Sequence, residues 1–251
     1  MKGAELIEKI CEKVREAGEI MVNAKRDENY IDAKEGHANF VTVYDKMIQE
    51  KLKKDLLTIL PEAVFVGEEE DVHAQIEKGY SFIVDPIDAT TNFIRDLHES
   101  AVSVALLHDG EQYIGVCYDP YSNEMYTAEK GQGACLNGKP IHVSDRDLKN
   151  SIVLFGTAPY YPELRQKTFE MASDYVRDAL DVRRMGSAVL DLCMVAAGKA
   201  EIFFELRLYP WDYAAASLIV IEAGGTATQL NGEALTMDRP CSVYAKGKGI
   251  L

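Results

Sequence analysis

Residues 81–93 read SFIVDPIDATTNF, an apolar run that leads directly into acidic residues. The run at 82–84 has the aromatic and β-branched composition of a buried strand. Because Pro86 disfavours the helical conformation at the residue before it, we expect Asp85 to stand at the C-terminal end of this strand. Asp88 follows three residues later and can turn back towards Asp85. The stretch therefore predicts two carboxylates held close together at the end of a strand.

Two interpretations of these carboxylates are open. Paired carboxylates repel each other unless one is protonated or a cation lies between them. The first interpretation is a bound cation, to which the Ile87 carbonyl offers a further oxygen ligand. Hard oxygen ligands favour Mg²⁺ or Mn²⁺ over Zn²⁺, and a helix opening at Ala89 to Thr91 would offer free N–H groups to a phosphate. The alternative is a turn and a helix cap, in which Asp88 and the threonine hydroxyls only satisfy backbone groups.

Length, charge and cysteine content place the chain among ordinary globular proteins. Its 251 residues, 47% of them hydrophobic, suffice for one large domain or two subdomains. The formal net charge of -14 disfavours nucleic acid or an anionic membrane as partner, because both would be repelled. Five scattered cysteines without CxxC spacing fit reduced thiols in a cytoplasm. The charged N-terminal stretch resembles neither a signal peptide nor a membrane anchor, so we expect a cytoplasmic protein.

Hydrophobic periodicity predicts the order of the elements. Apolar residues at three- and four-residue steps indicate one helix over residues 4–24 and another from near Asp45 to Pro61. Short β-rich runs with turns such as Asp109-Gly110 and Asn137-Gly138 indicate a largely antiparallel sheet in the middle of the chain. After about residue 150 the predicted elements alternate: strands near 152–155, 181–184 and 202–204, and helices at 162–178, 188–197 and 212–223.

These patterns predict a mixed α+β and α/β fold. Alternating strands and helices form sheets covered by helices, here a layered αβαβα sandwich. We place an N-terminal α+β subdomain at residues 1–145 and a C-terminal α/β subdomain at residues 146–251. Because no linker separates them, we expect one compact unit with the active site between the two subdomains.

Two further acidic positions occur at the ends of predicted elements. Glu68, Glu69 and Glu70 follow a strand at 64–66, and taken alone such a run is most often a solvated acidic loop. Asp212 precedes three alanines and taken alone is most often a helix N-cap. These segments by themselves therefore favour structural roles.

Three blocks resemble the signature motifs of the inositol monophosphatase family. They are VGEE at 66–69, DPIDATTNF at 85–93 and WDYAA at 211–215, in the family's order and at its approximate spacing. The similarity extends to NFVTVYD at 39–45, GQGA at 131–134, GSA at 186–188 and EAGG at 222–225. Nearly the whole chain is covered, which makes chance agreement very improbable.

The resemblance implies a set of site residues. Two or three Mg²⁺ ions, or Mn²⁺, would be held by Glu68, Asp85, Asp88, Asp212 and the Ile87 carbonyl. The catalytic residues implied are Glu68, Thr90 and Asp45, with the last two orienting or deprotonating the attacking water. The substrate contacts implied are Asp88, Ala89, Thr90, Gly186, Ser187, Ala188, Glu205 and Asp212.

The activity implied is hydrolysis of a small phosphate monoester, foremost inositol monophosphate. In this hypothesis one ion, on Glu68, Asp85 and Ile87, binds the water, and a second, on Asp85, Asp88 and Asp212, stabilises the leaving oxygen. The alternatives are a fructose-1,6-bisphosphatase or another sugar or nucleotide phosphatase of the same superfamily, and a non-catalytic regulatory scaffold. The resemblance also implies lithium sensitivity and a homodimer.

Three departures from the family pattern stand out. Ala89 replaces a usual glycine, which is harmless at negative φ and costly at positive φ. Asn39 replaces a frequent aspartate and bears on a third metal ion. Residues 94–97, IRDL, depart from the usual continuation and bear on substrate preference.

Overall fold

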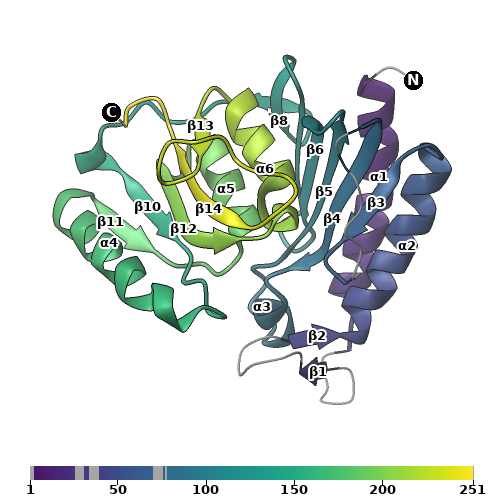
Figure 1. Ribbon diagram of the computed structural model, residues 1–251, viewed down its shortest axis with the longest axis horizontal. Helices are drawn as coiled ribbons and strands as arrows, with labels where there is room; N and C mark the ends of the chain where they lie inside the picture. Colours follow the sequence, from purple (N-terminus) through teal and green to yellow (C-terminus); the bar gives the residue numbers. More distant parts are fainter. Residues whose placement is uncertain (1–2, 26–30, 34–39, 70–75, 77, 251) are drawn as a thin grey trace.

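The computed structural model describes residues 3–25, 31–33, 40–69, 76 and 78–250. Two sheets and the helices on their faces form five layers in the order helix, sheet, helix, sheet, helix (Figure 1). The predicted αβαβα sandwich is therefore confirmed. Asn39 and Glu70 lie outside the described residues. Among the described residues, no helix combines the length and the apolar character needed to cross a bilayer.

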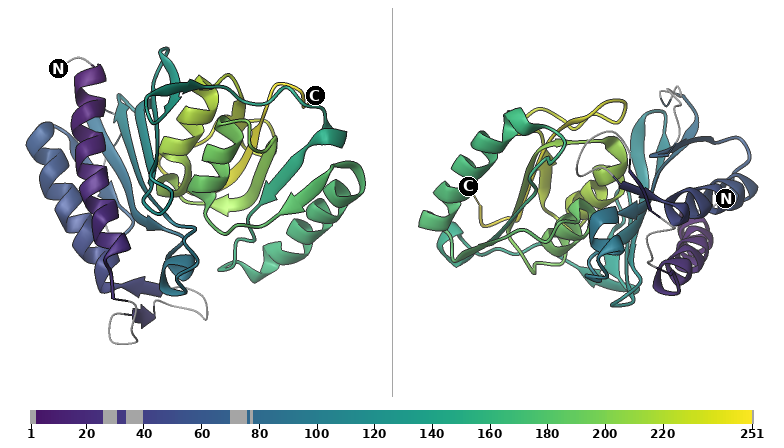
Figure 2. Two further views of the ribbon diagram at one scale, coloured as in Figure 1. Left: turned by 180° about the vertical axis from the view of Figure 1, so that it is seen from behind. Right: turned by 90° about the horizontal axis from the view of Figure 1, so that it is seen from below.

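The first layer consists of α1 (Gly3–Val22) and α2 (Val43–Ile59), which cover the outer face of the larger sheet (Figure 2). Helix α2 begins where a capping box forms. The Asp45 backbone N–H donates to Thr42 Oγ1 at 3.3 Å, and the Thr42 backbone N–H donates to Asp45 Oδ2 at 2.7 Å. This capping box holds the Asp45 carboxylate at the first turn of the helix.

The larger sheet has seven strands in the order β3-β4-β5-β6-β7-β8-β9. Only the β3–β4 pair is parallel, as expected for a largely antiparallel sheet. The predicted turns at Asp109-Gly110 and Asn137-Gly138 have positive φ at both residues, as tight hairpin turns need. The strands are β3 (Val64–Gly67), β4 (Tyr80–Asp88), β5 (Ala101–His108), β6 (Glu111–Asp119), β7 (Glu124–Glu129), β8 (Gly133–Leu136) and β9 (Lys139–Ile141).

The second sheet has five strands in the order β11-β10-β12-β14-β13 and is parallel at β11-β10-β12. Helix α4 (Arg165–Asp178), which follows the 3₁₀ turn η3 (Pro162–Leu164), covers its outer face. The sheets divide between residues 141 and 152; the subdomain boundary at residue 145 stays a prediction. The strands are β10 (Ile152–Phe155), β11 (Asp181–Arg183), β12 (Ile202–Leu208), β13 (Thr226–Thr228) and β14 (Cys241–Lys246). Further short elements are β1 (Ile31–Ala33), β2 (Phe40–Thr42), α3 (Thr90–Ile94) and η2 (Leu148–Asn150).

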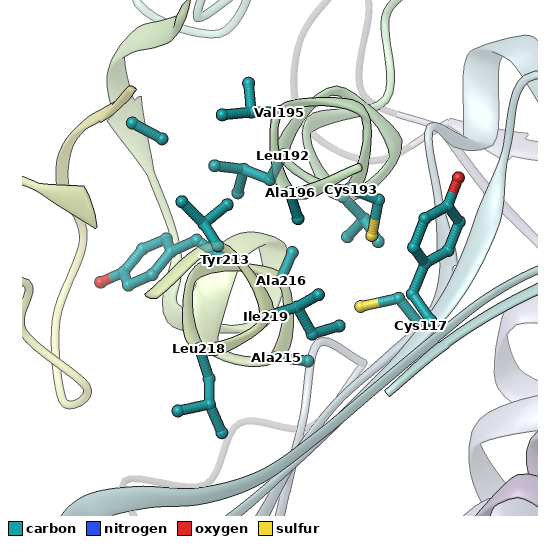
Figure 3. Close-up of a cluster of buried hydrophobic side chains, with 14 of the residues drawn as sticks. Cys117, Leu192, Cys193, Val195, Ala196, Tyr213, Ala215, Ala216, Leu218 and Ile219 are labelled. Carbon is teal, nitrogen blue, oxygen red and sulfur yellow. The ribbon is translucent and has the colours of Figure 1, made fainter. Parts of the chain in front are cut away.

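Helices α5 (Ala188–Ala196) and α6 (Pro210–Glu222) form the middle layer between the sheets. Such helices need apolar residues on all sides, because each side faces another element. Figure 3 shows this core, with side chains from both helices and Cys117 of the sheet. The labelled helix residues are Leu192, Cys193, Val195, Ala196, Tyr213, Ala215, Ala216, Leu218 and Ile219.

The structure corrects two expected boundaries. Strand β4 does not end at Asp85 but continues to Asp88, with an irregular register between these two residues. Pro86 lies at this irregularity, where its missing N–H is tolerated. Helix α6 begins at Pro210 rather than at Asp212, because proline suits the first helical position. Both carboxylates of β4 therefore belong to one bulged strand.

Helix α6 lies very close to the larger sheet. A Cβ atom added at Gly115 of β6 would lie 2.5 Å from the Ala215 carbonyl oxygen of α6. Glycine at this position therefore sets the distance between the sheet and the helix that carries Asp212.

We expect Gly115→Ala to lower the free energy of unfolding by about 1–3 kcal/mol, the usual cost of overpacking a core. Urea denaturation followed by circular dichroism measures this. Gly115→Val serves as a graded comparison and should lower it further, because a larger side chain meets the same carbonyl. Equal stability of all three proteins would contradict the close approach.

Candidate active site

Three of the predicted metal ligands come together in the structure. Asp85 and Asp88 of β4 and Asp212 of α6 each place one carboxylate oxygen within 4.8 Å of the other two. Asp85 and Asp88 are buried, and Asp212 is partly buried. The bulge in β4 and the start of α6 thus bring acids distant in sequence to one place.

The electrostatics of this cluster disfavour three bare charges. Burial and the charges of Glu68 and Asp88 raise the pKa of Asp85 well above its usual value. Burial also raises the pKa of Asp212, again with Asp88 and Glu68 contributing, and it raises the pKa of Asp88 to about 6. A bound cation relieves such repulsion. All three donors are hard carboxylate oxygens, so the cluster fits Mg²⁺ or Mn²⁺.

Glu68 and Ile87 border this cluster. Glu68 follows β3, and its backbone N–H donates to the Val84 carbonyl at 3.2 Å. The three-carboxylate group does not include Glu68, although the Glu68 charge acts on both Asp85 and Asp212. The Ile87 N–H donates to Asp85 Oδ1 at 3.0 Å, which orients that carboxylate. The metal-binding roles of Glu68 and Ile87 stay predictions.

Thr90 and Asp45 lie together, as the sequence predicts. Thr90 Oγ1 is 3.2 Å from Asp45 Oδ1 and also 3.2 Å from the Ile87 carbonyl oxygen. Its single hydrogen can serve only one of these acceptors at a time. Burial raises the pKa of Asp45 to about 6. The Thr90 hydroxyl thus lies between the Ile87 carbonyl and a buried carboxylate, and the catalytic roles of Thr90 and Asp45 stay predictions.

Asp88 is anchored to the beginning of α5. Ser187 Oγ and the Val189 N–H both donate to Asp88 Oδ2, the latter at 3.1 Å. Ser187 Oγ also accepts from the Leu190 N–H at 3.1 Å, so this hydroxyl caps the helix. Gly186 precedes the cap with a φ of 101°. The substrate contacts predicted for Gly186, Ser187 and Ala188 remain untested predictions.

Glu205 reaches this region from the second sheet. It is buried on β12, and Oε1 accepts from the Ala158 N–H at 2.7 Å. A Cβ atom at Gly156 would collide with Glu205 Oε2, so the carboxylate fills the space of a side chain there. Burial raises the pKa of Glu205 to about 7, although the Ala158 bond lowers it. The site thus receives acids from both sheets.

The comparisons with known proteins decide the family. The family model of the inositol monophosphatase family matches residues 3–250. The chain belongs to this family. It is 35% identical over 221 residues to "Nus factor SuhB" of Pasteurella multocida (strain Pm70), covering 87% of this chain and 82% of the relative.

Solved structures of the family agree with the fold. The extragenic suppressor protein suhB of Bartonella henselae superposes with a TM-score of 0.90 and 30% identity, covering 98% of this chain and 95% of the other. Inositol monophosphatase-II of Staphylococcus aureus MSSA476 has a TM-score of 0.84 and 29% identity, covering 98% and 92%. The chain therefore has the phosphatase-type fold of this family, and its acidic cluster could hold a metal ion.

Ala89 adopts the left-handed conformation, with φ 65° and ψ 52°. The family usually has glycine here, and only glycine adopts this conformation without a steric cost. Ala89 immediately precedes the short helix α3 and follows Asp88. The chain therefore carries backbone strain beside its acidic cluster.

Two residues of the site were missed by sequence reasoning. Burial and the charges of Glu68 and Asp212 raise the pKa of Tyr160 to about 12, so its hydroxyl responds to the acids of this region. No local sequence signal marks this loop tyrosine. Asp191 is buried in α5, and its Oδ1 has no hydrogen-bond partner among the described residues. An acidic side chain within the apolar run of this helix could have marked Asp191 in the sequence.

Replacing Ala89 tests the strain. Ala89→Gly removes a steric cost of about 1–2 kcal/mol, offset in part by about 0.4–1 kcal/mol of added unfolded-state entropy. We expect unchanged or slightly higher stability by urea denaturation. The control Ala179→Gly, at a helix end with φ -94°, should lower stability by about 0.5–1 kcal/mol. Equal losses in both variants would contradict a strained Ala89.

The raised pKa of Glu205 predicts a pH dependence of stability in EDTA. A raised carboxyl pKa means that the folded protein binds this proton more tightly than the unfolded chain does. The stabilisation of the fold by protonated Glu205 is therefore complete below about pH 4.5 and is lost as pH rises through about 7. Relative to Glu205→Gln, the wild-type free energy of unfolding should fall by on the order of 3 kcal/mol across this window.

Glu163→Gln, an exposed substitution of the same kind, is the control for this profile and should follow wild type. Urea denaturation at a series of pH values provides the measurement. Parallel wild-type and Glu205→Gln profiles would show that burial does not perturb Glu205.

Proposed function

We propose that this protein is a Mg²⁺-dependent phosphatase that hydrolyses a small phosphate monoester, foremost inositol monophosphate. The observation that carries the proposal is the cluster of Asp85, Asp88 and Asp212 with the Thr90–Asp45 pair beside it. Family membership supports the reaction class, and the name of the S. aureus relative supports the substrate. The -14 net charge makes local positive charge necessary for any phosphate ligand.

Different residues of the site have different roles in the proposed hydrolysis. Bound Mg²⁺ would be held by the three aspartates, with Glu68 and the Ile87 carbonyl, and would supply charge neutralisation and a more acidic water. Thr90 Oγ1 would take the proton of the attacking water as it passes its own hydrogen to the Asp45 carboxylate, so that Asp45 holds the proton and the threonine hydroxyl is restored. Backbone N–H groups of Ala89 and Thr90 orient the phosphate.

The alcohol part of the ester lies on the side of Glu205 and α5. Glu205 Oε1 is already bonded to Ala158, which leaves Oε2 to accept from a substrate hydroxyl. The start of α5 adds backbone contacts at Gly186 and Ala188. A buried carboxylate that needs a hydroxyl partner favours hydroxyl-rich alcohols over apolar ones.

The relatives named Nus factor SuhB favour a second candidate function, a regulatory scaffold that keeps the fold. The two candidates differ in whether the site turns over substrate. Phosphate release from inositol 1-phosphate, fructose 1,6-bisphosphate and 2′-AMP, each with Mg²⁺, Mn²⁺ or EDTA, separates them. We expect metal-dependent release with the highest kcat/KM for inositol 1-phosphate. No release from any ester with either metal would favour the scaffold.

Asp85→Asn removes the carboxylate that both other aspartates face. We expect kcat/KM to fall at least about 100-fold, as when a group that stabilises transition-state charge is lost. Asp174→Asn, on the exposed side of α4, is the matched control and should retain wild-type activity. Near wild-type, Mg²⁺-dependent turnover by folded Asp85→Asn would contradict the proposed site.

A further inference from the structure

The loop between β10 and η3 is fixed at both ends to the active site. Near its start, the Ala158 N–H donates to Glu205 Oε1 at 2.7 Å. At its end, the Tyr161 hydroxyl lies 2.9 Å from the Tyr209 hydroxyl. The Tyr209 backbone N–H in turn donates to Asp212 Oδ2 at 2.7 Å. Residues 158–161 are thus held between a predicted substrate ligand and a predicted metal ligand.

The positively charged side chain of Arg207 strengthens the attachment at Tyr161. The guanidinium of Arg207 lies 4.4 Å from the centroid of the Tyr161 ring, a distance suited to a cation–π contact. Arg207 belongs to β12, the strand that also carries Glu205. The loop therefore follows β12 closely, and its side chains have defined positions relative to the site.

Tyr160 lies between these two attachments. Its side chain is 50% exposed, and the chain on either side of it is tied to the site: Ala158 is bonded to Glu205, and Tyr161 is bonded to Tyr209. Burial and the charges of Glu68 and Asp212 also raise the pKa of the Tyr160 hydroxyl. Unlike the neighbouring Tyr161, it has no hydrogen-bond partner among the residues that the structure describes. The hydroxyl of Tyr160 is therefore an unused donor on a loop that is bonded to both Glu205 and Tyr209.

We propose that Tyr160 determines substrate specificity by donating a hydrogen bond to a hydroxyl on the alcohol part of the phosphate ester. The inference rests on the proposed function and narrows its substrate class to phosphates of polyols. The cations and backbone N–H groups serve the phosphate, whereas the loop of Tyr160 is bonded to Glu205 on the alcohol side. A protonated phenol and a buried carboxylate together provide one donor and one acceptor, which suits neighbouring hydroxyl groups.

Tyr160→Phe removes the hydroxyl and keeps the ring. For inositol 1-phosphate and glycerol 2-phosphate we expect kcat/KM to fall about 5- to 10-fold, mostly through KM, the effect of losing one neutral hydrogen bond. For p-nitrophenyl phosphate, whose alcohol part has no hydroxyl, kcat/KM should stay unchanged. The inhibition constant of inorganic phosphate should also stay unchanged, because phosphate alone lacks the alcohol part.

Tyr113→Phe is the matched control, because Tyr113 is bonded to Glu129 on the larger sheet, away from the cluster. It should leave all four measurements at wild-type values. A second variant, Tyr160→Ala, should match or exceed the Tyr160→Phe loss for the polyol phosphates. Thermal unfolding of each variant reports whether the loop still folds.

Two outcomes would overturn the role of Tyr160. Equal kcat/KM of wild type and Tyr160→Phe for every ester would show that the hydroxyl makes no productive contact. An equal loss for p-nitrophenyl phosphate, with weaker inhibition by phosphate, would assign the hydroxyl to the phosphate. Both leave the phosphatase activity intact. Failure of the proposed function is a separate result, in which the wild-type protein hydrolyses none of the esters.

Discussion

The mutual repulsion of three carboxylates, two of them buried and one partly buried, is the constraint on which the rest of the structure depends. Asp85, Asp88 and Asp212 bring their oxygens within 4.8 Å in a site of low solvent access. Charges at such distances are costly unless each also has a hydrogen-bond donor or a cation. The Ile87, Val189 and Tyr209 backbone N–H groups donate to Asp85, Asp88 and Asp212, respectively. The protein thus orients each acid and leaves between them a shared space that could hold a metal ion.

The layered architecture follows from the need to hold these acids rigidly. Asp85 and Asp88 come from a strand buried on both faces, with Phe82 in the outer core and Ile83 in the inner one. Asp212 comes from a helix that approaches the sheet closely at Gly115. The second sheet contributes Glu205 from β12. A site supported from three layers is of the kind that suits the proposed catalysis by positioning and charge.

Backbone strain and the residue proposed to select the substrate both lie next to the acidic cluster rather than within it. Ala89 accepts a left-handed conformation beside Asp88, the sort of local strain that a well-supported functional site tolerates. The loop of Tyr160 is bonded to Glu205 and to Tyr209. Relatives that share the fold carry the names SuhB and inositol monophosphatase.

The sequence by itself determined the elements and the acids of the cluster. Periodicity marks α1 and α2, turn residues such as Asn137-Gly138 mark hairpins, and the motif order identifies Asp85, Asp88 and Asp212. These signals are local, because each depends on residues a few positions apart. Only the tertiary structure decided the sign of φ at Ala89. It also decided the bulge around Pro86, because strand register depends on a partner distant in the chain. The loop of Tyr160 lies near the site only because it is bonded to Glu205 of β12 and to Tyr209, and no local pattern encodes such long-range contacts.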